Sequence, residues 1–445
     1  MQRVAAVALV AVTALVIGPL AHAADSLPSG SSSASSASSA TGWSAISAES
    51  GTAPTAAGVR AQIARFARSD ALRRSGVIVI DPGSQQTLFA KQEARPLTPA
   101  STVKILTAAA ALEALGPNTR LATRVATQGD VVYLIGGGDA TLPRALKTDS
   151  LPRGPASLRR LARDTATSLG TRTRVDVVFD DSLFSGRVLG PGWPKGFPAA
   201  GVAAPVTALM INQGRRAPSS RARVDDPARK AAQAFATLLE KRGVQVNRVS
   251  RGLAPLGASE IARVESATVT EIVKAMLTDS DNDVAESLGH LVGKEMLDDG
   301  SFAGGAQATT MILQNAGVDV SNLALVDASG LSGRNKATPS TIGDVLVDVV
   351  RGERWPAIVQ GLAVAGATGT LADRFATKAT SAGRGVVRAK TGTLTGVGSL
   401  AGTVVDTTGR PLVFVVIGNG VRSQARARDA MDRIASELAE CGCNS

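Results

Sequence analysis

Apolar and polar residues first follow a regular pattern near residue 59. Apolar side chains recur at the spacing of a helix face over residues 59–67, which predicts an amphipathic helix. The β-branched run 77–80 predicts a strand that ends in an Asp-Pro-Gly turn, and residues 87–90 predict the returning strand. Helix, strand and turn in this order indicate that a folded domain begins near residue 57.

The middle of the chain carries short strand patterns separated by Gly- and Pro-rich breaks. Strands are predicted at 131–135 and 175–179, and one amphipathic helix, 227–242, lies among them. The last third of the chain returns to longer elements. There we expect helices at 269–276, 283–297 and 306–315, strands at 386–391, 398–406 and 411–417, and a closing helix at 423–438.

Two segments of different character precede the folded part. Arg3, an apolar run at 4–20 and the Ala-His-Ala sequence that follows it predict that residues 1–23 are the signal peptide of an exported protein. A retained N-terminal anchor is the alternative, although the run is shorter than the ~20 residues that span a bilayer. Residues 24–56 are rich in Ser, Ala, Gly and Thr, which predicts a flexible linker.

Composition limits the classes of function. Hydrophobic residues make up 44% of the 445 residues and charged residues 19%, which is typical of a globular protein of one to three domains. The net charge of +11 favours contact with anionic surfaces. Aromatic residues are only 3% of the chain, too few for the stacking surfaces that single-strand binders use, so we expect no nucleic-acid partner.

Cysteine and histidine are scarce, which excludes several chemistries. Cys441 and Cys443 are the only cysteines, so no disulfide framework or zinc ribbon is available. We expect a frayed terminus that can close one small disulfide, and the redox state of this pair stays open. With His22 in the predicted signal peptide, any Ser-His-Asp mechanism would depend on His290, which we expect to be an ordinary helix residue.

One helix start carries residues suited to nucleophilic catalysis. Thr-Pro at 98–99 and Gly-Pro at 116–117 predict where this helix begins and ends. Ser101 and Lys104 then fall on one face of it. The free backbone N–H groups of a first turn favour an oxyanion near Ser101. Lys104 can serve as a base where burial or a neighbouring cation lowers its pKa.

Two further motifs follow in a fixed order. Ser280-Asp281-Asn282 lies where a helix is predicted to begin, and Lys390-Thr391-Gly392-Thr393 lies at the end of a predicted strand. Taken alone, the first is explained by a helix N-cap and the second by a strand-end turn. Ser-x-x-Lys, Ser-x-Asn and Lys-Thr-Gly each occur once in the chain, and together they are typical of penicillin-recognising serine enzymes.

The chain resembles the D-alanyl-D-alanine carboxypeptidase/endopeptidases known as low-molecular-mass class C penicillin-binding proteins. The resemblance covers nearly everything from 59 to about 420. Besides the three motifs, it rests on the phrases at 99–101, 115–117, 136–142, 179–184, 191–194, 204–209, 327–332, 369–371 and 390–394.

The resemblance implies an α+β fold of the penicillin-binding and serine β-lactamase type, an antiparallel sheet flanked by helices, with an inserted strand-rich domain. The 179 positions between Ser101 and Ser280 match the extra domain that this family inserts. We therefore expect an inserted domain at 119–264 between two catalytic segments, 57–118 and 265–445.

The resemblance also implies a mechanism that needs no metal or organic cofactor. Ser101 would attack the carbonyl of the penultimate D-Ala, and Lys104 would take its proton. Ser280 would relay a proton to the leaving amine, while Asn282 orients Lys104 and the substrate amide. Lys390 would add positive charge beside the site.

Substrate contacts are implied at other positions. The hydroxyls of Thr391 and Thr393 would bind the terminal carboxylate beside Gly392, and the Thr393 N–H would complete the oxyanion hole. Asp180 or Asp181 matches the acidic residue that contacts the free amine of the stem peptide in the family. A carboxylate that caps a turn after the preceding strand is the alternative for both.

The expected partners are peptidoglycan stem peptides and, as acylating inhibitors, β-lactam antibiotics. The enzyme would work outside the cytoplasm, peripheral to the membrane or wall. The alternatives are a serine β-lactamase or esterase that uses the same Ser101 and Lys104, and a non-catalytic protein that holds wall polymers on its basic surface. Carboxypeptidase and endopeptidase activity stay open, because both use the same acyl-enzyme.

Overall fold

A six-stranded sheet joins the beginning and the end of the folded chain. Its strand order is β2-β1-β11-β10-β9-β8, and every neighbouring pair is antiparallel. The strands are β1 (Ser75–Asp81), β2 (Gln86–Lys91), β8 (Ala363–Val364), β9 (Val387–Leu394), β10 (Val397–Val405) and β11 (Pro411–Asn419). This computed structural model describes residues 47–145 and 156–443. The predicted signal peptide and the linker up to residue 46 lie outside the described residues.

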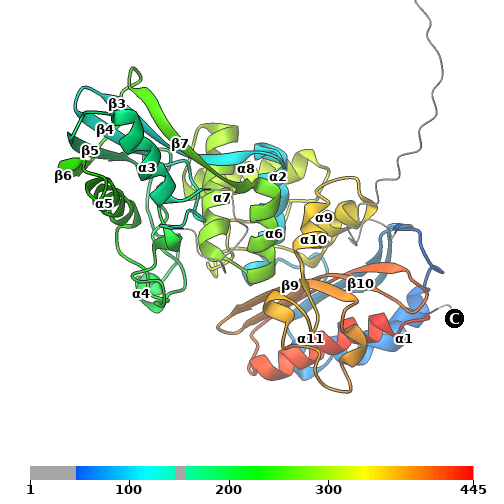
Figure 1. Cartoon of the computed structure of the whole chain (residues 1–445). Coiled ribbons are helices and arrows are strands. Elements are labelled where there is room, and N and C mark those ends of the chain that lie inside the picture. Colours follow the sequence, from blue (N-terminus) through cyan, green and yellow to red (C-terminus); the bar gives the residue numbers. More distant parts are fainter. Residues whose placement is uncertain (1–46, 146–155, 444–445) are drawn as a thin grey trace, which may run out of the picture. The chain divides into compact units, whose positions relative to one another are not determined.

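Side chains of the central strands alternate between the two faces of this sheet. Val77 and Val79 of β1 join the apolar cluster under α1 (Ala56–Ala67) and α11 (Gln424–Ala439), which lie side by side (Figure 1). Ile78 and Ile80 join the cluster on the opposite face. Because both faces are covered by helices there, the central strands β1 and β11 are almost entirely apolar and buried.

The opposite face packs against a group of helices that carries two of the three motifs. The Ala- and Leu-rich helix that follows Ser101 lies buried among the other helices of this group, and the apolar side chains of the group form one continuous cluster. Its members are α2 (Val103–Leu115), α6 (Val269–Asp279), α7 (Asn282–Leu297), α8 (Phe302–Asn315), α9 (Pro339–Arg351) and α10 (Ala357–Gly361).

A second, five-stranded sheet is formed by the middle of the chain, from Arg120 to Thr268. Its order is β6-β5-β4-β3-β7; β5 runs parallel to β4 and β6, and the other pairs are antiparallel. The strands are β3 (Arg120–Gln128), β4 (Val131–Ile135), β5 (Arg174–Asp180), β6 (Gln245–Arg251) and β7 (Ser259–Thr268). The division into an inserted domain at 119–264 and two catalytic segments stays a prediction.

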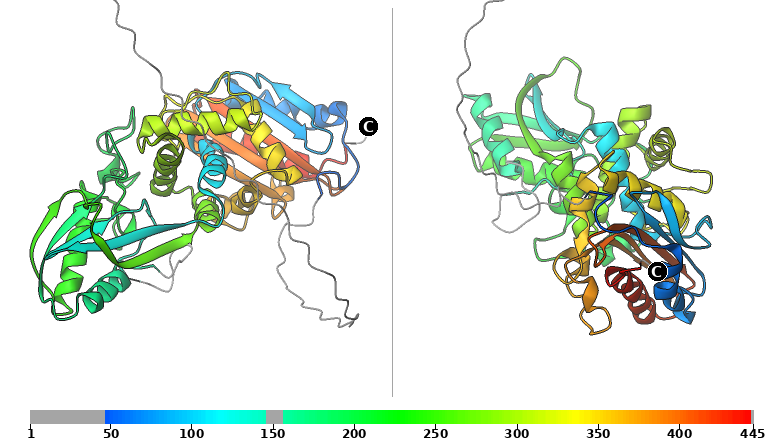
Figure 2. Two further views of the ribbon diagram at one scale, coloured as in Figure 1. Left: turned by 90° about the horizontal axis from the view of Figure 1, so that it is seen from above. Right: turned by 90° about the vertical axis from the view of Figure 1, so that its right-hand side faces the viewer.

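Two helices cover one face of the second sheet, where the sequence pattern predicted one. They are α3 (Leu158–Leu169) and α5 (Pro227–Glu240), and both contribute to the apolar cluster of this sheet (Figure 2). The prediction missed α3, although Leu158, Leu161 and Leu169 recur on one helix face there. A four-residue helix, α4 (Phe197–Ala200), lies in the long connection between β5 and α5.

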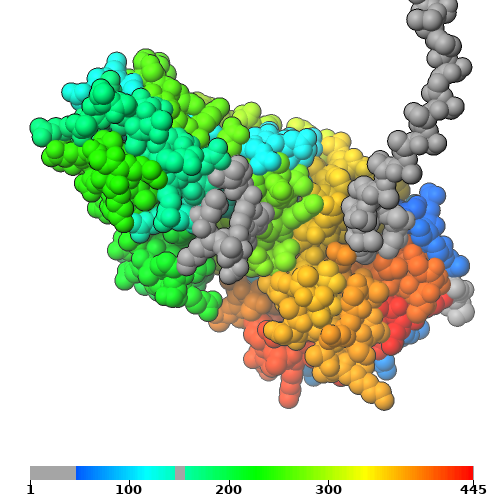
Figure 3. Space-filling model, viewed as in Figure 1, coloured from blue at the N-terminus to red at the C-terminus, as the bar shows by residue number. Residues whose placement is uncertain are grey.

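The ends of the described chain meet at the surface of the six-stranded sheet. The Thr55 N–H donates to the Cys443 carbonyl (2.7 Å), and the Thr52 N–H donates to the Thr408 hydroxyl (3.1 Å). The last residues of the predicted linker are therefore fixed to the folded unit rather than flexible. Cys441 forms a disulfide with Cys443 and is buried. Figure 3 shows the blue first elements beside the orange and red last ones.

The α+β fold class is confirmed by this arrangement of an antiparallel sheet between helices. Among the described residues, no helix is both long and apolar enough to cross a membrane.

Candidate active site

Ser101 lies in a tight turn that leads into α2. Residues Ala100–Thr102 form a single 3₁₀ turn, and α2 begins only at Val103. The Thr102 and Ser399 hydroxyls both donate to the Pro99 carbonyl, at 2.8 and 2.6 Å, which fixes the turn to β10. The predicted helical turn at Ser101 is therefore present as a 3₁₀ turn that continues directly into α2, and contacts with the sheet hold it in place.

Thr98 also differs from its prediction as an N-cap. Its hydroxyl donates to the Gly333 carbonyl (3.2 Å) and accepts from the Lys336 ammonium (2.7 Å), so it joins the turn to a distant loop. Gly330 in the same loop has a positive φ, and a Cβ there would lie 2.0 Å from the Ala100 carbonyl oxygen. The backbones of the loop and of the Ser101 turn thus approach as closely as glycine allows.

Lys104 is fully buried, and its amine has three hydrogen-bond partners. Its Nζ lies 3.1 Å from Ser101 Oγ, 2.7 Å from Asn282 Oδ1 and 2.7 Å from the Ser329 carbonyl oxygen. The Asn282 amide is held in this orientation because its Nδ2 donates to the Val202 carbonyl (2.9 Å). Two of the three predicted motifs therefore meet at one nitrogen atom.

The pKa of Lys104 is lowered to about 8, and burial is the main cause. The negative charges of Glu286 and Asp327 act against burial and raise this pKa, as do those of Asp281 and Asp283. Burial, rather than a neighbouring cation, is thus the first reason why the Lys104 amine loses its proton more easily than an exposed lysine.

Lys390 brings the third motif to the same place. It is fully buried on β9, and its Nζ donates to the Thr391 carbonyl (2.9 Å). Burial and then the positive charge of Lys104 hold the pKa of Lys390 well below its ordinary value. A Cβ at Gly392 would lie 2.1 Å from Ser399 Oγ, so only glycine lets this part of β9 pack beside the Ser101 turn.

The two threonines of the third motif differ in their surroundings. The Thr391 hydroxyl donates to the hydroxyl of Thr370, which belongs to the Gly-Thr-Leu turn at 369–371 (2.9 Å). Thr393 is exposed on β9. Its hydroxyl has no hydrogen bond with any residue in the described part of the chain, so it is free to meet a ligand.

Ser280 and Asp281 lie at the ends of two different helices, although the motif was predicted to mark one helix start. Ser280 ends α6 in the left-handed conformation (φ +60°), an uncommon conformation for a residue other than glycine. Asp281 is the N-cap of α7 and accepts from the Val284 N–H (3.0 Å). The partly exposed Ser280 hydroxyl makes no hydrogen bond within the described ranges, 47–145 and 156–443.

Two buried carboxylates beside this cluster carry no predicted role. Glu286 accepts from the Ala328 and Ser329 N–H groups at 3.1 and 2.8 Å. Asp327 accepts from the Gly330 and Ser332 N–H groups, at 2.9 and 2.7 Å, and from two side chains. Those side chains are Trp193, through Nε1 (2.8 Å), and Asn335, through Nδ2 (2.6 Å). Residues 327–332 are among those on which the family resemblance rests, so the sequence pointed to this loop, but it assigned no role to Asp327 or Glu286.

His290 takes no part in the cluster. Its ring packs against those of Phe184 and Phe302, with centroids 5.0 and 4.5 Å apart, and its Nδ1 lies 2.8 Å from the Glu286 carbonyl oxygen. Burial lowers the pKa of His290 to about 4. The imidazole is therefore neutral at pH 7 and serves the core of α7, as the sequence predicted.

Comparison with known proteins decides the family. The model of the D-Ala-D-Ala carboxypeptidase 3 (S13) family matches residues 59–222 and 215–440. The chain belongs to the S13 carboxypeptidase family. It is 38% identical over 401 residues to a carboxypeptidase of Mycobacterium tuberculosis, covering 88% of this chain and 85% of the relative. It is 39% identical over 361 residues to carboxypeptidase DacB of Mycolicibacterium smegmatis, covering 79% and 77%.

The fold of this S13 carboxypeptidase is that of a solved penicillin-binding protein. Penicillin-binding protein 4 of Haemophilus influenzae superposes with a TM-score of 0.72 and 22% identity, over 88% of this chain and 99% of that one. The predicted family, the penicillin-binding fold and the serine-type D-Ala-D-Ala carboxypeptidase function are confirmed. The β-lactamase and non-catalytic alternatives are set aside by the family.

Asp180 and Asp181 of the carboxypeptidase make their contacts with residues outside the Ser101 cluster. Asp180 accepts from the Ser182 and Ala254 N–H groups at 2.9 and 2.8 Å, and Asp181 pairs with Arg251 at 3.2 Å. Across the described ranges, neither carboxylate contacts Ser101 or its hydrogen-bond partners. The structure therefore favours the capping interpretation for Asp180, and no contact supports a substrate role for either residue.

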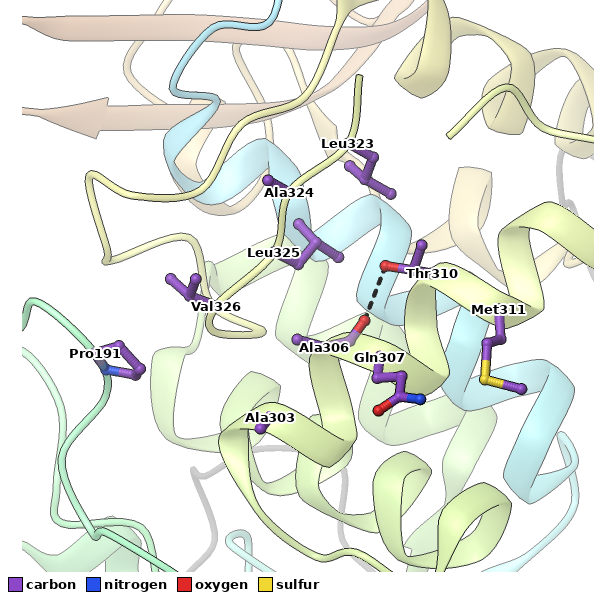
Figure 4. A pocket seen from close by; sticks show the side chains of 10 residues that line it. All are labelled: Pro191, Ala303, Ala306, Gln307, Thr310, Met311, Leu323, Ala324, Leu325 and Val326. Carbon is purple, nitrogen blue, oxygen red and sulfur yellow. Dashed lines mark hydrogen bonds between the residues drawn. The ribbon is translucent and has the colours of Figure 1, made fainter. Parts of the chain in front are cut away.

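A cavity of about 480 Å³ lies away from the predicted site residues, between α8 and the segment 323–326 (Figure 4). Its lining is mainly apolar, with Gln307 and Thr310 as the polar members, and Thr310 donates to its own helix (2.9 Å). Val326 lines the cavity and directly precedes Asp327. The cavity thus borders the loop that contacts Lys104 but holds none of the groups suited to the reaction.

Proposed function

We propose that this carboxypeptidase releases the terminal D-Ala of peptidoglycan stem peptides through an acyl-enzyme on Ser101. The observation that carries the proposal is the set of partners around Lys104 Nζ. The Asn282 amide oxygen and the Ser329 carbonyl can only accept hydrogen bonds. A neutral amine gives them both of its hydrogens, so its lone pair is left for the Ser101 hydroxyl proton.

The steps follow from these positions. Ser101 Oγ attacks the carbonyl carbon of the penultimate D-Ala while its proton passes to Lys104 Nζ. The N–H groups of Ser101 and Thr393 stabilise the oxyanion. The peptide bond breaks as the leaving amine takes a proton by way of the Ser280 hydroxyl, and water then hydrolyses the ester. The Ser280 hydroxyl, which makes no hydrogen bond within the described ranges, supports this relay, as does its position two residues before Asn282.

Binding of the substrate carboxylate is assigned to the third motif. Lys390 contributes positive charge when protonated, and the hydroxyls of Thr391 and Thr393 donate hydrogen bonds to the carboxylate. The exposed, unpartnered hydroxyl of Thr393 supports this assignment, and Gly392 keeps the strand close to the nucleophile. Asp180 and Asp181 are left as the weaker candidates for contact with the stem-peptide amine.

The setting of the reaction is proposed from the sequence. Residues 1–23 would export the enzyme, which would act outside the cytoplasm at the wall, peripheral to the membrane. β-Lactam antibiotics would acylate Ser101, and a β-lactam complex of the Haemophilus influenzae penicillin-binding protein 4, a structure of the same fold, is consistent with this. Release of a free D-Ala and cleavage of a cross-link are both compatible with the proposed acyl-enzyme.

Intact-protein mass spectrometry of residues 24–445 after incubation with benzylpenicillin tests the proposal. We expect one persistent adduct, mapped by digestion to Ser101, and D-Ala release from a stem pentapeptide. Ser101→Ala should abolish both the adduct and the release, whereas the exposed control Ser381→Ala should retain both. An adduct on another residue, D-Ala release by Ser101→Ala, or rapid penicillin hydrolysis without an adduct would overturn it.

A further inference from the structure

The loop that carries Ser329 is held at both of its ends by its own backbone. The N–H of Ala324 donates to the carbonyl of Lys336 at 2.9 Å, and the Lys336 N–H donates back at 2.7 Å. Before the loop, residues 323–326 lie against α8, as Figure 4 shows. The ends alone do not determine where the Ser329 carbonyl points, because several residues lie between them.

Buried carboxylates determine the path between these ends. Glu286 accepts the consecutive N–H groups of Ala328 and Ser329, one on each carboxylate oxygen. Asp327 accepts the N–H groups of Gly330 and Ser332. Glu286 and Asp327 are 1% and 2% exposed, so water does not compete for these hydrogen bonds.

Glu286 also lies one helical turn after Asn282 on α7. Asn282 contacts Lys104 directly. Glu286 acts on Lys104 through Ser329: the Ser329 N–H donates to Glu286, and the Ser329 carbonyl accepts from Lys104 Nζ at 2.7 Å. We propose that Glu286 is a positioning residue, whose carboxylate fixes the Ala328–Ser329 backbone and thereby aims the Ser329 carbonyl at Lys104. This rests on the proposed role of Lys104 as the base.

The charged groups around Lys104 come from several elements. Burial, followed by the charge of Asp327, raises the pKa of Glu286 to about 8, while its hydrogen bonds to the loop lower it. The neutral imidazole of His290 faces the next turn of the same helix. The titratable groups that act on Lys104 are Asp281, Asp283 and Glu286 from α7, Asp327 from the loop and Lys390 from β9.

This arrangement gives Glu286 a second, measurable effect. Lys104 is a base only when neutral, so the acylation rate rises with pH through the pKa of Lys104. Glu286 raises that pKa through its negative charge, which it carries above its own pKa of about 8. Its removal therefore lowers the pKa, and the acid limb of the pH profile moves to lower pH. A carboxylate of α7 that does not act on Lys104 would leave that limb in place, so the limb tests the electrostatic contact and the plateau tests the positioning.

The test is the rate of Ser101 acylation by benzylpenicillin, measured from pH 5 to pH 10 for Glu286→Gln. The matched control is Glu295→Gln, the same change at an exposed position of α7. For Glu286→Gln we expect the plateau to fall roughly 10- to 100-fold, because one loop N–H then faces an NH₂ group. The acid limb should move to lower pH. The control should match the wild type in both.

A plateau within twofold of the wild type, or an unmoved acid limb, would overturn the role of Glu286. If Glu286→Gln does not fold, as judged by its near-UV circular dichroism, Glu286→Asp decides. This variant keeps the charge but is shorter, so the limb should stay while the plateau falls; an unchanged plateau would overturn the proposal. A wild-type protein without a Ser101 adduct would instead overturn the proposed function, together with this role.

Discussion

Charged side chains are buried around Ser101, whereas the charged pairs on strands β3 and β7 of the five-stranded sheet are largely exposed. Lys104, Lys390 and Glu286 are at most 1% exposed, and each has hydrogen-bond partners. On the second sheet, Arg263 pairs with Glu260 while 51% and 40% of their side chains stay in contact with solvent. The same residue types therefore have shifted pKa values in one region and stay in contact with solvent in the other.

The difference shows where in this chain charged groups are removed from water, which costs free energy. A buried ion costs several kcal/mol unless it is paired and hydrogen-bonded, whereas an exposed pair is worth roughly 0–1 kcal/mol. Among the described lysines, the two whose side chains are fully buried, Lys104 and Lys390, both lie near Ser101, and burial is the main cause of their lowered pKa values. Substitutions that remove one partner from buried and from exposed pairs should therefore differ widely in effect.

The largest effect is expected at the ion pair that joins the two regions. Arg223, from the connection between β5 and α5, donates to Asp283 of α7 at 2.7 and 3.1 Å, and both side chains are buried. Arg223→Ala leaves the buried Asp283 carboxylate without its charged partner, while the Ala204 N–H still donates to it (2.6 Å). We expect the free energy of unfolding, from urea titration, to fall by about 3–5 kcal/mol at pH 8.

The pH dependence of this loss is a control on its cause. Burial raises the pKa of Asp283 to about 6 even with Arg223 present, so the carboxylate should hold its proton more tightly still once Arg223 is removed. At pH 5 the group is neutral in Arg223→Ala, and the loss of stability should be smaller than at pH 8. An equal loss at both pH values would show that lost packing, rather than unpaired charge, dominates.

A smaller effect is expected at Asp180, a buried carboxylate at the end of β5. It accepts two backbone N–H groups, from Ser182 and Ala254. Asp180→Asn replaces one acceptor oxygen with an NH₂ group, so we expect a loss of about 1–2 kcal/mol in thermal or urea unfolding.

Kinetics on two substrates separates this capping role from substrate recognition. A capping role should leave the ratio of KM values for amine-bearing and amine-blocked stem peptides unchanged in Asp180→Asn. A rise in KM confined to the amine-bearing peptide would restore the substrate role that the family resemblance implies.

The two regions also differ in what could be predicted from the sequence. Ser101, Lys104 and Asn282 were predicted because their residue types and spacing carry the chemistry, and the structure brings all three together. The Ser329 carbonyl could not be found in this way, since every residue has one. Glu286 occupies a polar position in a helix pattern, and only the tertiary fold shows that it is buried.

Local signals failed where distant segments compete with them. Thr98 has the features of an N-cap, yet its hydroxyl bonds to the loop at 333–336, and a 3₁₀ turn precedes α2. In the six-stranded sheet β1 and β11 are distinct apolar runs, because helices cover both faces there, and both were predicted; the two-residue strand β8 was missed. In the second sheet β3, β6 and β7 have no such run and were missed.

The smallest effect is expected at the exposed pair on the second sheet. Glu260 lies 3.0 Å from Arg263 and 3.9 Å from Arg124, but all three side chains are at least 40% exposed. Water and salt screen such charges, so Glu260→Gln should change the free energy of unfolding by less than about 0.5 kcal/mol. Any change should shrink further in 0.5 M NaCl, and acylation of Ser101 should be unaffected. A loss comparable to that of Arg223→Ala would contradict the distinction between the two regions, because solvent exposure would then not decide what a charge contributes.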